Sequence, residues 1–507
     1  MPLQTTELVV GVIGAGAMGA GIAQVAAAAG HKVFLFDLRP GAAAEAIQGI
    51  AASLDRQVGR GKLSSDARVD QLSRLSPIDH IRFVASAGLV VEAVKEDLAV
   101  KRELFVQLES LVAEDALLAT NTSSISVTAI GAALKRPRRF AGLHFFNPAP
   151  VMQLVEVVAG LATAPEVVDT LMALASAWGK YPVRTRSTPG FIVNRVARPF
   201  YAEALRVLYE GAAGPETIDA LMRDGLGFKM GPFELMDLIG HDVNFAVTSS
   251  VHAAHFGDPR FSPSIIQREH VEAGWLGRKS GRGFYDYTPG GQRRVVEAWS
   301  GPAPTTVTVK SGLDYISPLL GRLQNAGVTL AFDANQTTEL VVGNVALALT
   351  DGRTATERAA SSGRDEFVVF DLMDWQDGAR IAIAKADQSA SESLSVAAGL
   401  FAAVNVQASP IDDIPGLIGM RTIAMLSNEA ADSVLQGVGS AKDIDTAMQK
   451  GANYPIGPLA MADKLGPGRI VEVLRNLTDA YGEDRYRTSV LLRRKAMARS
   501  KFHSENE

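Results

Sequence analysis

The feature that most constrains the fold of this 507-residue chain is an internal repeat. The segment TPGFIVNRVARPFYAEA at 188–204 aligns without gaps with IPGLIGMRTIAMLSNEA at 414–430. The offset is 226 residues, as the pair Arg195 and Arg421 shows (421 − 195), and it holds as far as Gly240, over about fifty residues. A shared register of this length predicts two copies of one supersecondary module.

The rest of the chain is organised around these two helical copies. Ahead of the first copy, short β-branched runs alternate with helical patterns, which predicts a Rossmann domain with a doubly wound, mainly parallel sheet. The strands expected there are 8–13, 32–37, 89–94, 116–120, 140–146, 154–158 and 181–186. Residues 287–307 read as a linker, and strand-like runs return at 328–332, 338–342, 367–370 and 380–384. The sequence therefore predicts an NAD-binding Rossmann domain at 1–187, an all-α domain at 188–287, a reduced Rossmann-like domain at 308–408 and the second all-α copy at 409–507.

Composition excludes several classes of function. The net charge of −5 disfavours a general nucleic-acid binder. There is no cysteine, so disulfides, thiolate metal sites and cysteine nucleophiles are excluded, and we expect no metal. The first ten residues lack the basic stretch of a signal peptide, and no apolar run is long enough to span a bilayer. We expect a cytoplasmic protein that does not engage membranes.

A glycine-rich turn follows the first expected strand. The motif GAGAMG at 14–19 places Gly14, Gly16 and Gly19 in the G-x-G-x-x-G pattern, with Met18 before the last glycine. The three glycines would permit a tight turn, a close approach of the backbone to a diphosphate, and close packing of helix on strand. The N-terminus of the following helix would attract the diphosphate. The pattern predicts a dinucleotide site.

The second strand ends at an acidic residue that selects the dinucleotide. Asp37 lies 23 residues after Gly14, where a carboxylate accepts hydrogen bonds from the ribose hydroxyls. Its charge repels the 2′-phosphate of NADP, so NAD is the expected cofactor. Arg39, two residues further on, keeps NADP as the alternative.

A histidine and a glutamate supply candidate acid–base groups. His144, in GLHFFNPAP, is expected at the carboxyl end of a strand, where open α/β sheets bind ligands. Glu156 lies in the apolar strand LVEVV, where an unpaired carboxylate is costly. We expect Glu156 to hold the His144 ring in one tautomer and to stabilise the imidazolium. The alternatives are a core histidine and an outward-facing glutamate.

Three motifs then identify a family. NTSSISV at 121–127, GLHFFNPAPVMQLVEVV at 142–158 and STPGFIVNR at 187–195 resemble the L-3-hydroxyacyl-CoA dehydrogenases, and the similarity extends from about residue 9 to residue 287. The resemblance implies oxidation of a 3-hydroxyacyl-CoA by NAD, with His144 and Glu156 as the catalytic dyad. The remaining residues that it implies are Ser123, Asn147 and Asn194 at the substrate, with Ser123 and Asn194 also catalytic, and Asn121, Glu96 and Lys101 at the cofactor. Taken singly, Asn121, Ser123 and Asn194 read equally well as turn or helix caps.

The whole length resembles a longer bacterial subgroup that acts in phenylacetate degradation and carries a duplicated C-terminal domain. That resemblance implies (S)-3-hydroxyadipyl-CoA as substrate, although no basic residue in the sequence can be assigned to its distal carboxylate. 3-Hydroxybutyryl-CoA remains the competing substrate, and a non-catalytic NAD-binding structural protein is the alternative of another class. A β-hydroxyacid dehydrogenase would use a lysine on a glycine-rich helix instead of the dyad, and a hydratase activity is not predicted.

The second copy lacks the polar groups of the first. Asn194 corresponds to Met420 (194 + 226), and no histidine–glutamate strand pair or glycine motif precedes that copy. We therefore expect the α/β segment before this copy to bind no dinucleotide. We expect the copy itself to pack against the first copy as a second subunit does in shorter relatives, with an independent binding module as the alternative. Whether the full chain forms a homodimer is left open, as is whether the basic segment at 274–287 contacts CoA or is a solvated turn.

Overall fold

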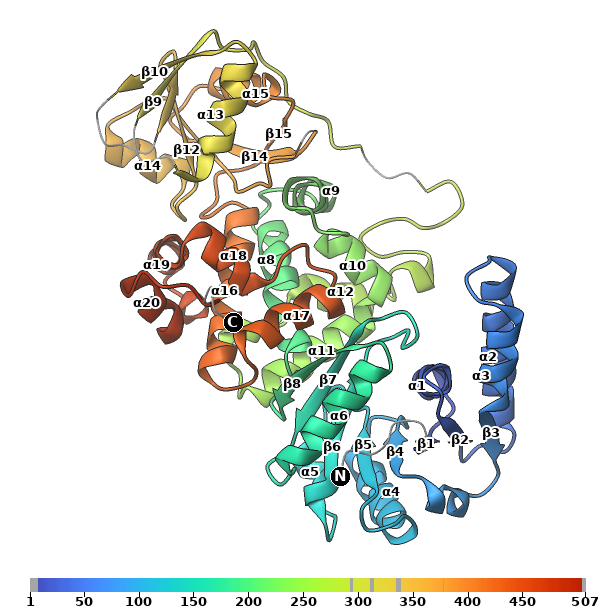
Figure 1. Cartoon of the computed structure of the whole chain (residues 1–507). Helices are drawn as coiled ribbons and strands as arrows, with labels where there is room; N and C mark the ends of the chain where they lie inside the picture. The colour runs from blue at the N-terminus through green and yellow to red at the C-terminus, as the bar shows by residue number, and fades with distance from the viewer. Residues whose placement is uncertain (1–7, 292–294, 311–313, 334–338, 377, 504–507) are drawn as a thin grey trace. The chain divides into compact units, whose positions relative to one another are not determined.

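The computed structural model describes residues 8–291, 295–310, 314–333, 339–376 and 378–503 (Figure 1). The chain divides into two compact units. One runs to Arg195 and adds Gln436–Ala452, and the other comprises Val196–Leu435 and the residues from Asn453 onward. This division differs from the four predicted domains, whose boundaries stay a prediction. Among the described residues, no helix is long and apolar enough to cross a membrane.

The first unit is built on an eight-stranded sheet of order β3-β2-β1-β4-β5-β6-β7-β8. All neighbouring strands are parallel except β6 and β7, which run antiparallel. The strands are β1 (Val9–Ile13), β2 (Lys32–Phe36), β3 (Leu75–Ile78), β4 (Leu89–Glu92), β5 (Leu117–Thr120), β6 (Phe140–Phe145), β7 (Leu154–Ala159) and β8 (Tyr181–Arg186). The chain order reverses direction at β1, as in a doubly wound sheet, so the carboxyl ends of β1, β4, β5 and β6 lie along one edge.

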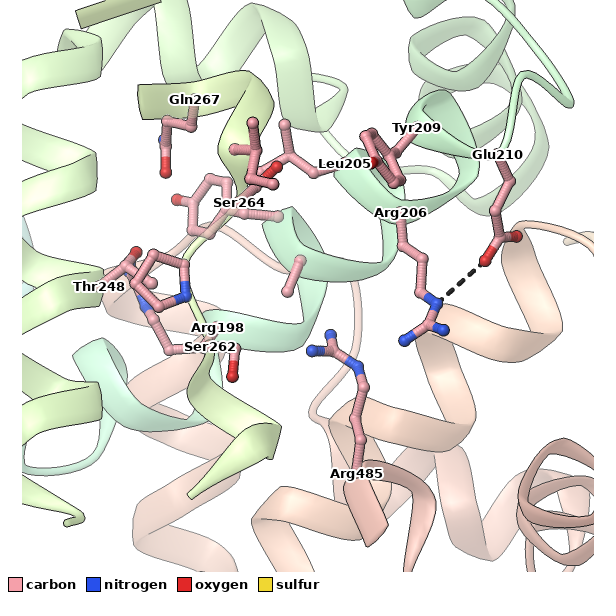
Figure 2. Close-up of a pocket in the computed structure, with 14 residues that line it drawn as sticks. Arg198, Leu205, Arg206, Tyr209, Glu210, Thr248, Ser262, Ser264, Gln267 and Arg485 are labelled. Atoms are coloured by element: carbon pink, nitrogen blue, oxygen red, sulfur yellow. Dashed lines mark hydrogen bonds and ion pairs between the residues drawn. The ribbon is translucent and has the colours of Figure 1, made fainter. Parts of the chain in front are cut away.

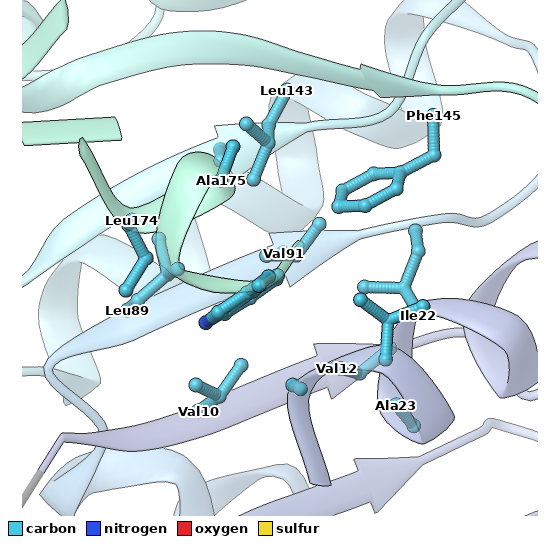
Figure 3. Close-up of a cluster of buried hydrophobic side chains, with 14 of the residues drawn as sticks. Val10, Val12, Ile22, Ala23, Leu89, Val91, Leu143, Phe145, Leu174 and Ala175 are labelled. Carbon is cyan, nitrogen blue, oxygen red and sulfur yellow. The ribbon is translucent and has the colours of Figure 1, made fainter. Parts of the chain in front are cut away.

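Side chains alternate between the two faces of this sheet and form two separate cores. In β1, Val10 and Val12 join the core beneath α1 (Ala17–Ala28) and α6 (Pro165–Ala177), together with Leu143 and Phe145 of β6 (Figure 3). The opposite face is covered by α4 (Leu98–Leu111) and α5 (Val127–Gly131). The remaining helices of this region are α2 (Ala42–Gly59), α3 (Ser65–Ser73) and α7 (Val193–Val196). The expected Rossmann fold is confirmed.

A helix from the second repeat belongs to the first unit. This helix, α17 (Ala441–Gly451), packs against β7 and β8. The backbone N–H of Arg186 donates to the carbonyl of Val438 at 3.0 Å, just before the helix. Gly451, at its end, lies so close to Leu154 and Val193 that a Cβ there would fall 2.4 Å and 3.1 Å from their side chains. Only a residue without a side chain permits this approach.

The second unit contains most of both helical copies. The first copy comprises α8 (Arg198–Tyr209), α9 (Pro215–Ala220), α10 (Pro232–Ile239), α11 (His241–Ala254) and α12 (Ile265–Glu272). The second comprises α16 (Gly419–Leu435), α18 (Pro458–Leu465), α19 (Pro467–Tyr481) and α20 (Val490–Met497), with α17 in the other unit. The bounds of α10 and α18 differ by 226 at both ends, and α8 packs against α16. The structure thus contains the duplicated module, and its two copies pack on each other.

A second, mixed sheet lies between the two copies in sequence. Its order is β10-β9-β11-β12-β13-β14-β15. The strands are β9 (Thr306–Lys310), β10 (Thr329–Asp333), β11 (Leu340–Val342), β12 (Val345–Leu349), β13 (Phe367–Phe370), β14 (Arg380–Lys385) and β15 (Gln407–Pro410); its helices are α13 (Ser317–Asn325), α14 (Ala355–Ser362) and α15 (Glu392–Ala402). Along β12 to β15 the neighbours are parallel, antiparallel and parallel, as they are from β5 to β8. This part repeats the end of the Rossmann sheet; Thr338, which begins one of the predicted strands, lies outside the described residues.

Candidate active site

The glycine turn has the geometry that a dinucleotide site requires. Gly14 has φ +102°, and a Cβ there would lie 2.5 Å from the carbonyl oxygen of Ala93. A Cβ on Gly19 would lie 1.7 Å from the carbonyl oxygen of Gly14. A Cβ on Gly16 would meet nothing within 4 Å. Two glycines are therefore required by the fold, whereas Gly16 leaves open the space that a diphosphate would approach, at the N-terminus of α1.

Asp37 follows β2 and faces the same turn. One carboxylate oxygen accepts from the N–H of Ala15 at 2.7 Å and the other from the N–H of Arg39 at 2.9 Å. The Arg39 guanidinium itself forms an exposed ion pair with Glu45, with Nη2 2.7 Å from Oε2. Arg39 is thus engaged with a carboxylate, and Asp37 presents the negative charge that favours NAD over NADP.

A buried ionic cluster lies at the carboxyl ends of β4 and β5. The Lys101 ammonium is fully buried, 2.5 Å from Glu92 Oε1 and 3.3 Å from Glu96 Oε2. The other Glu92 oxygen accepts from the Thr120 hydroxyl at 2.7 Å. The sequence indicated Lys101 and Glu96 but missed Glu92. The signal was present, since Glu92 is a carboxylate in the apolar run LVVE, the same kind of signal that identified Glu156.

Glu96 holds the loop that carries Ser123. Its Oε1 accepts from the Thr122 hydroxyl at 2.5 Å and from the backbone N–H groups of Ser123 and Ser124 at 3.0 and 3.1 Å. Burial raises the pKa of the Glu96 carboxyl, but the hydrogen bond from Thr122 and the charge of Lys101 outweigh burial and hold that pKa below its ordinary value. Glu96 therefore stays ionised and fixes the backbone on which Ser123 is presented.

His144 and Glu156 face each other across β6 and β7. They are directly paired in the antiparallel register, and His144 Nδ1 lies 2.7 Å from Glu156 Oε2. His144 is 5% exposed and Glu156 is fully buried. The rings of Phe146 and Phe191 flank the imidazole, with centroids 4.5 Å and 5.8 Å away. With Nδ1 bound to the carboxylate, Nε2 is the nitrogen left to exchange a proton.

The same glutamate fixes the start of α7. Glu156 Oε1 accepts from the N–H groups of Ile192 and Val193 at 2.9 Å and 3.0 Å. Asn194, the next residue, is half-buried on this helix. One carboxylate therefore positions both the candidate base and the helix that carries the candidate amide.

Asn121 joins this arrangement from β5. Its Oδ1 accepts from the N–H of Phe145 at 2.8 Å, which ties the end of β5 to the strand position next to His144. Asn147 follows β6 and is exposed. Glu96 thus fixes the backbone of Ser123, and Glu156 fixes both His144 and the helix that carries Asn194. The Asn121 side chain connects β5 to β6, which differs from the interpretation of Asn121 as a turn cap.

At the matching helix start of the second copy a carboxylate again accepts backbone hydrogen bonds, but it comes from the other strand, and among the described residues no histidine is paired with it. Asp371, directly after β13, accepts from the N–H groups of Ile418, Gly419 and Met420 at 2.9, 2.6 and 2.9 Å. Ile418 and Gly419 are the 226-residue equivalents of the two residues bound by Glu156. Burial raises the Asp371 pKa to about 6, against the backbone hydrogen bonds. Asp371 holds the helix alone, which fits a structural role for this copy.

The acidic and histidine side chains were also considered as ligands for a metal ion. Within the described ranges, no group of three or more His, Asp or Glu side chains is placed to hold a metal ion. For NAD the residues present do fit, because the open face of Gly16, the start of α1 and the Asp37 carboxylate together match a diphosphate and a ribose.

Family models match nearly all of the described chain. The NAD-binding domain of 3-hydroxyacyl-CoA dehydrogenase matches residues 9–188, and the C-terminal domain of that family matches twice, at 190–287 and 416–504. The reduced Rossmann-fold domain of 3-hydroxybutyryl-CoA dehydrogenase matches 347–415. The chain belongs to the 3-hydroxyacyl-CoA dehydrogenase family, whose members are NAD-dependent oxidoreductases.

Some relatives match this chain along nearly its whole length, and others match only about half of it. The chain is 48% identical to 3-hydroxyadipyl-CoA dehydrogenase of Escherichia coli over 98% of both chains. A crystal structure of 3-hydroxybutyryl-CoA dehydrogenase from Escherichia coli K12 matches 97% of this chain and 98% of its own, at 46% identity and a TM-score of 0.89. A probable 3-hydroxybutyryl-CoA dehydrogenase of Bacillus subtilis is 43% identical, and the match covers 96% of that protein but only 54% of this chain. The full-length relatives thus share the duplicated architecture.

Proposed function

We propose that this enzyme oxidises (S)-3-hydroxyadipyl-CoA to 3-oxoadipyl-CoA in phenylacetate catabolism. The general reaction follows from the family, and the adipyl substrate is supported by the relative of that name that matches the chain along its whole length. A second candidate, (S)-3-hydroxybutyryl-CoA, is favoured by the name of the full-length solved relative. The observation that carries the chemistry is the buried contact of 2.7 Å between His144 and Glu156.

The proposed reaction moves one proton and one hydride. Bound NAD supplies the hydride acceptor. His144 Nε2 takes the proton of the 3-hydroxyl as the C3–H bond breaks and the C3 carbonyl forms. Glu156 holds Nδ1 and stabilises the imidazolium, and Ser123 and Asn194 hold the oxygen as its charge develops.

The residues proposed at the cofactor site bind NAD and hold it in position. Gly14, Gly16 and Gly19, with Met18 between them, form the diphosphate turn, and Asp37 accepts from the ribose. Asn121 directly follows β5, Glu96 lies in the loop after β4 and binds the loop of Ser123, and Lys101 acts through Glu96. Asn147, exposed beyond β6, is proposed at the substrate. A cytoplasmic location remains a prediction of the sequence, and the sequence leaves open whether the chain forms a homodimer.

The decisive test is NADH formation, followed by absorbance, with the adipyl and butyryl thioesters at equal concentration. A strong preference for (S)-3-hydroxyadipyl-CoA would support the proposal. Preference for the butyryl thioester would keep the mechanism and refute the adipyl assignment. No NADH from either would contradict the enzymatic reading and favour the non-catalytic alternative.

A further inference from the structure

A cavity of about 410 Å³ lies in the second unit, within the first helical module. Its walls come mainly from α8, α11, α12 and the stretch that precedes α12 (Figure 2). The side chains of Ala202, Leu205 and Ile265 give part of this wall an apolar character. Every lining residue belongs to the second unit, whereas His144 and Glu156 belong to the first. A ligand held by these residues is therefore a ligand of the second unit alone.

Arg198 lines this cavity and is buried without an acidic partner. It is 5% exposed, and its Nη1 donates to the hydroxyl of Thr248 at 2.9 Å. Its Nε is buried without a hydrogen-bond partner among the described residues, and the guanidinium lies 4.9 Å from the ring centroid of Tyr201. No carboxylate in the described part of the chain forms an ion pair with Arg198. The guanidinium thus keeps both a charge and a donor that the protein itself does not match.

The charge of Arg198 is unfavourable in this position. Burial lowers the pKa of its guanidinium, and the phenols of Tyr201 and Tyr454 act in the opposite direction without outweighing burial. A buried charge without an opposite charge beside it destabilises a folded protein. Proteins keep such unfavourable groups chiefly at functional sites. An anion from outside the protein would supply the charge that Arg198 lacks.

The other two arginines that line the cavity are already neutralised. Arg206 Nη2 lies 2.6 Å from Glu483 Oε1, and Arg485 Nη2 lies 2.7 Å from Glu203 Oε1. Both guanidinium groups therefore serve ion pairs within the protein. Among the arginines of this lining, Arg198 is the one whose charge is left for a ligand.

The second copy of the module shows that the fold does not require this guanidinium. At the offset of 226, Arg198 and Thr248 correspond to Ala424 and Leu474. Both replacements are apolar and fully buried. The module thus packs with an apolar interior in the second copy, so the buried polar pair of the first copy serves a purpose other than folding.

We infer that this cavity is a separate binding site for a small free carboxylic acid with an apolar body, such as an alkanoate. The planar fork of donors on Arg198 suits the two oxygens of a carboxylate, and Thr248 engages only one nitrogen of that fork. The hydrocarbon part of the acid lies against Ala202, Leu205 and Ile265. Sulfate or phosphate would match the charge of the site but not its apolar wall. The acid is not the substrate of the proposed reaction, and the site does not depend on the proposed function.

The first test is calorimetric titration of the full chain with sodium hexanoate. We expect the wild type to bind hexanoate and Arg198→Met to lose about 30-fold or more in affinity, because the acid loses its buried charged partner. 1-Hexanol, which has the same chain without the charge, should bind far more weakly. Arg198→Lys keeps the charge but not the fork, so it should retain part of the affinity and tests the site even if Arg198→Met fails to fold. The matched control is Arg493→Met, at an exposed arginine on α20, which should bind hexanoate as the wild type does.

Thermal unfolding provides a second measurement of the same site. Hexanoate in large excess should raise the melting temperature of the wild type, because a ligand that binds only the folded state stabilises it. The same addition should leave the melting temperature of Arg198→Met unchanged. Neither measurement requires turnover, so both stand whether or not the proposed reaction is observed.

Three results would overturn the inference. Hexanoate binding that is absent in the wild type, or unchanged in Arg198→Met, would show that the cavity does not hold the acid. Equally strong binding of sodium sulfate, lost together with that of hexanoate in Arg198→Met, would reveal a site for any anion. Competition between hexanoate and the acyl-CoA in steady-state rates, abolished in Arg198→Met, would assign the cavity to part of the substrate instead of a separate acid.

Discussion

Arg485, near the end of the second helical copy, forms a buried ion pair with Glu203 of the first. Arg485 Nη2 lies 2.7 Å from Glu203 Oε1, and Arg421 Nε lies 3.0 Å from the other oxygen. The reverse contact is also present, since Arg260 of the first copy lies 2.9 Å from Glu429 of the second. Each copy thus contributes an arginine that pairs with a glutamate of the other copy, as two identical subunits do across a twofold axis.

Glu203→Gln should therefore destabilise the packing of the two copies. The change removes the carboxylate of the buried Arg485 and leaves Arg421 with Glu210 alone, which costs about 3–5 kcal/mol. The midpoint of urea denaturation measures this loss. The matched control is Glu483→Gln, which breaks a half-exposed pair with Arg206 and should cost less than about 1 kcal/mol. Equal effects of the two variants would contradict a special role for the buried pair.

The same pair predicts how stability depends on pH. Burial raises the pKa of Glu203, but the charges of Arg485 and Arg421 outweigh burial and hold the pKa below its ordinary 4.5. A depressed carboxyl pKa stabilises the folded state above pH 4.5, and this contribution is lost as the pH falls through the folded-state pKa. Melting curves of wild type and Glu203→Gln should thus converge below about pH 4.5. A constant difference between pH 3 and pH 7 would refute the ionised state.

His144→Gln should lower turnover by about 10²–10⁴, the usual contribution of a general base. The change retains a polar side chain next to Glu156 but removes the proton acceptor. The affinity for NAD, measured by fluorescence titration, should change little because the glycine turn is untouched. Turnover near that of wild type would remove His144 from the role of base.

Two glycines of the same turn should respond oppositely to alanine. Gly16→Ala adds a Cβ with no neighbour within 4 Å, so the melting temperature should hold while the affinity for NAD falls. Gly19→Ala places a Cβ 1.7 Å from a backbone oxygen and should destabilise the unit itself. Melting curves with and without NAD distinguish the two. Unchanged NAD affinity in Gly16→Ala would show that the diphosphate does not approach this residue.

Glu96→Gln should affect catalysis more than folding. The glutamine cannot accept the hydrogen bonds from Thr122, Ser123 and Ser124 as a carboxylate does, and charged hydrogen bonds contribute about 1.5–3 kcal/mol each. We expect kcat to fall roughly 10- to 100-fold, with a smaller change in the KM for NAD. Glu114→Gln, at an exposed carboxylate, is the control. A fall in melting temperature that accounted for the activity loss would make Glu96 a purely structural residue.

The sequence predicted those features whose signals are local. The glycine turn, the dyad and the repeat each depend on residue types at short or fixed spacings, and the strands that carry them were expected within a few residues of their bounds. The strand Leu75–Ile78 was missed because it is short and contains a proline. The order of the second sheet depends on long-range pairing that no local pattern encodes.

Other features depend on what a side chain meets in three dimensions. Asp371 accepts hydrogen bonds from the backbone of residues 418–420, nearly fifty residues further along the chain. Its local sequence, FVVFD, indicates only the end of a strand. Arg198 reads in the sequence as one more arginine of a helix. Only the folded structure shows that its Nε is buried without a hydrogen-bond partner among the described residues.

The position of α17 in the first unit bears on how the protein is made. When Arg195 has been added to the growing chain, 257 residues (452 − 195) remain before Ala452 completes that unit. At roughly 5–20 residues per second, the ribosome needs roughly 13–50 s for this stretch. During that interval the surfaces of Leu154 and Val193 lack the helix that later covers them. The first unit is thus begun first and finished late, and its nascent sheet must wait for a segment that is synthesised after residues 196–435 of the second unit.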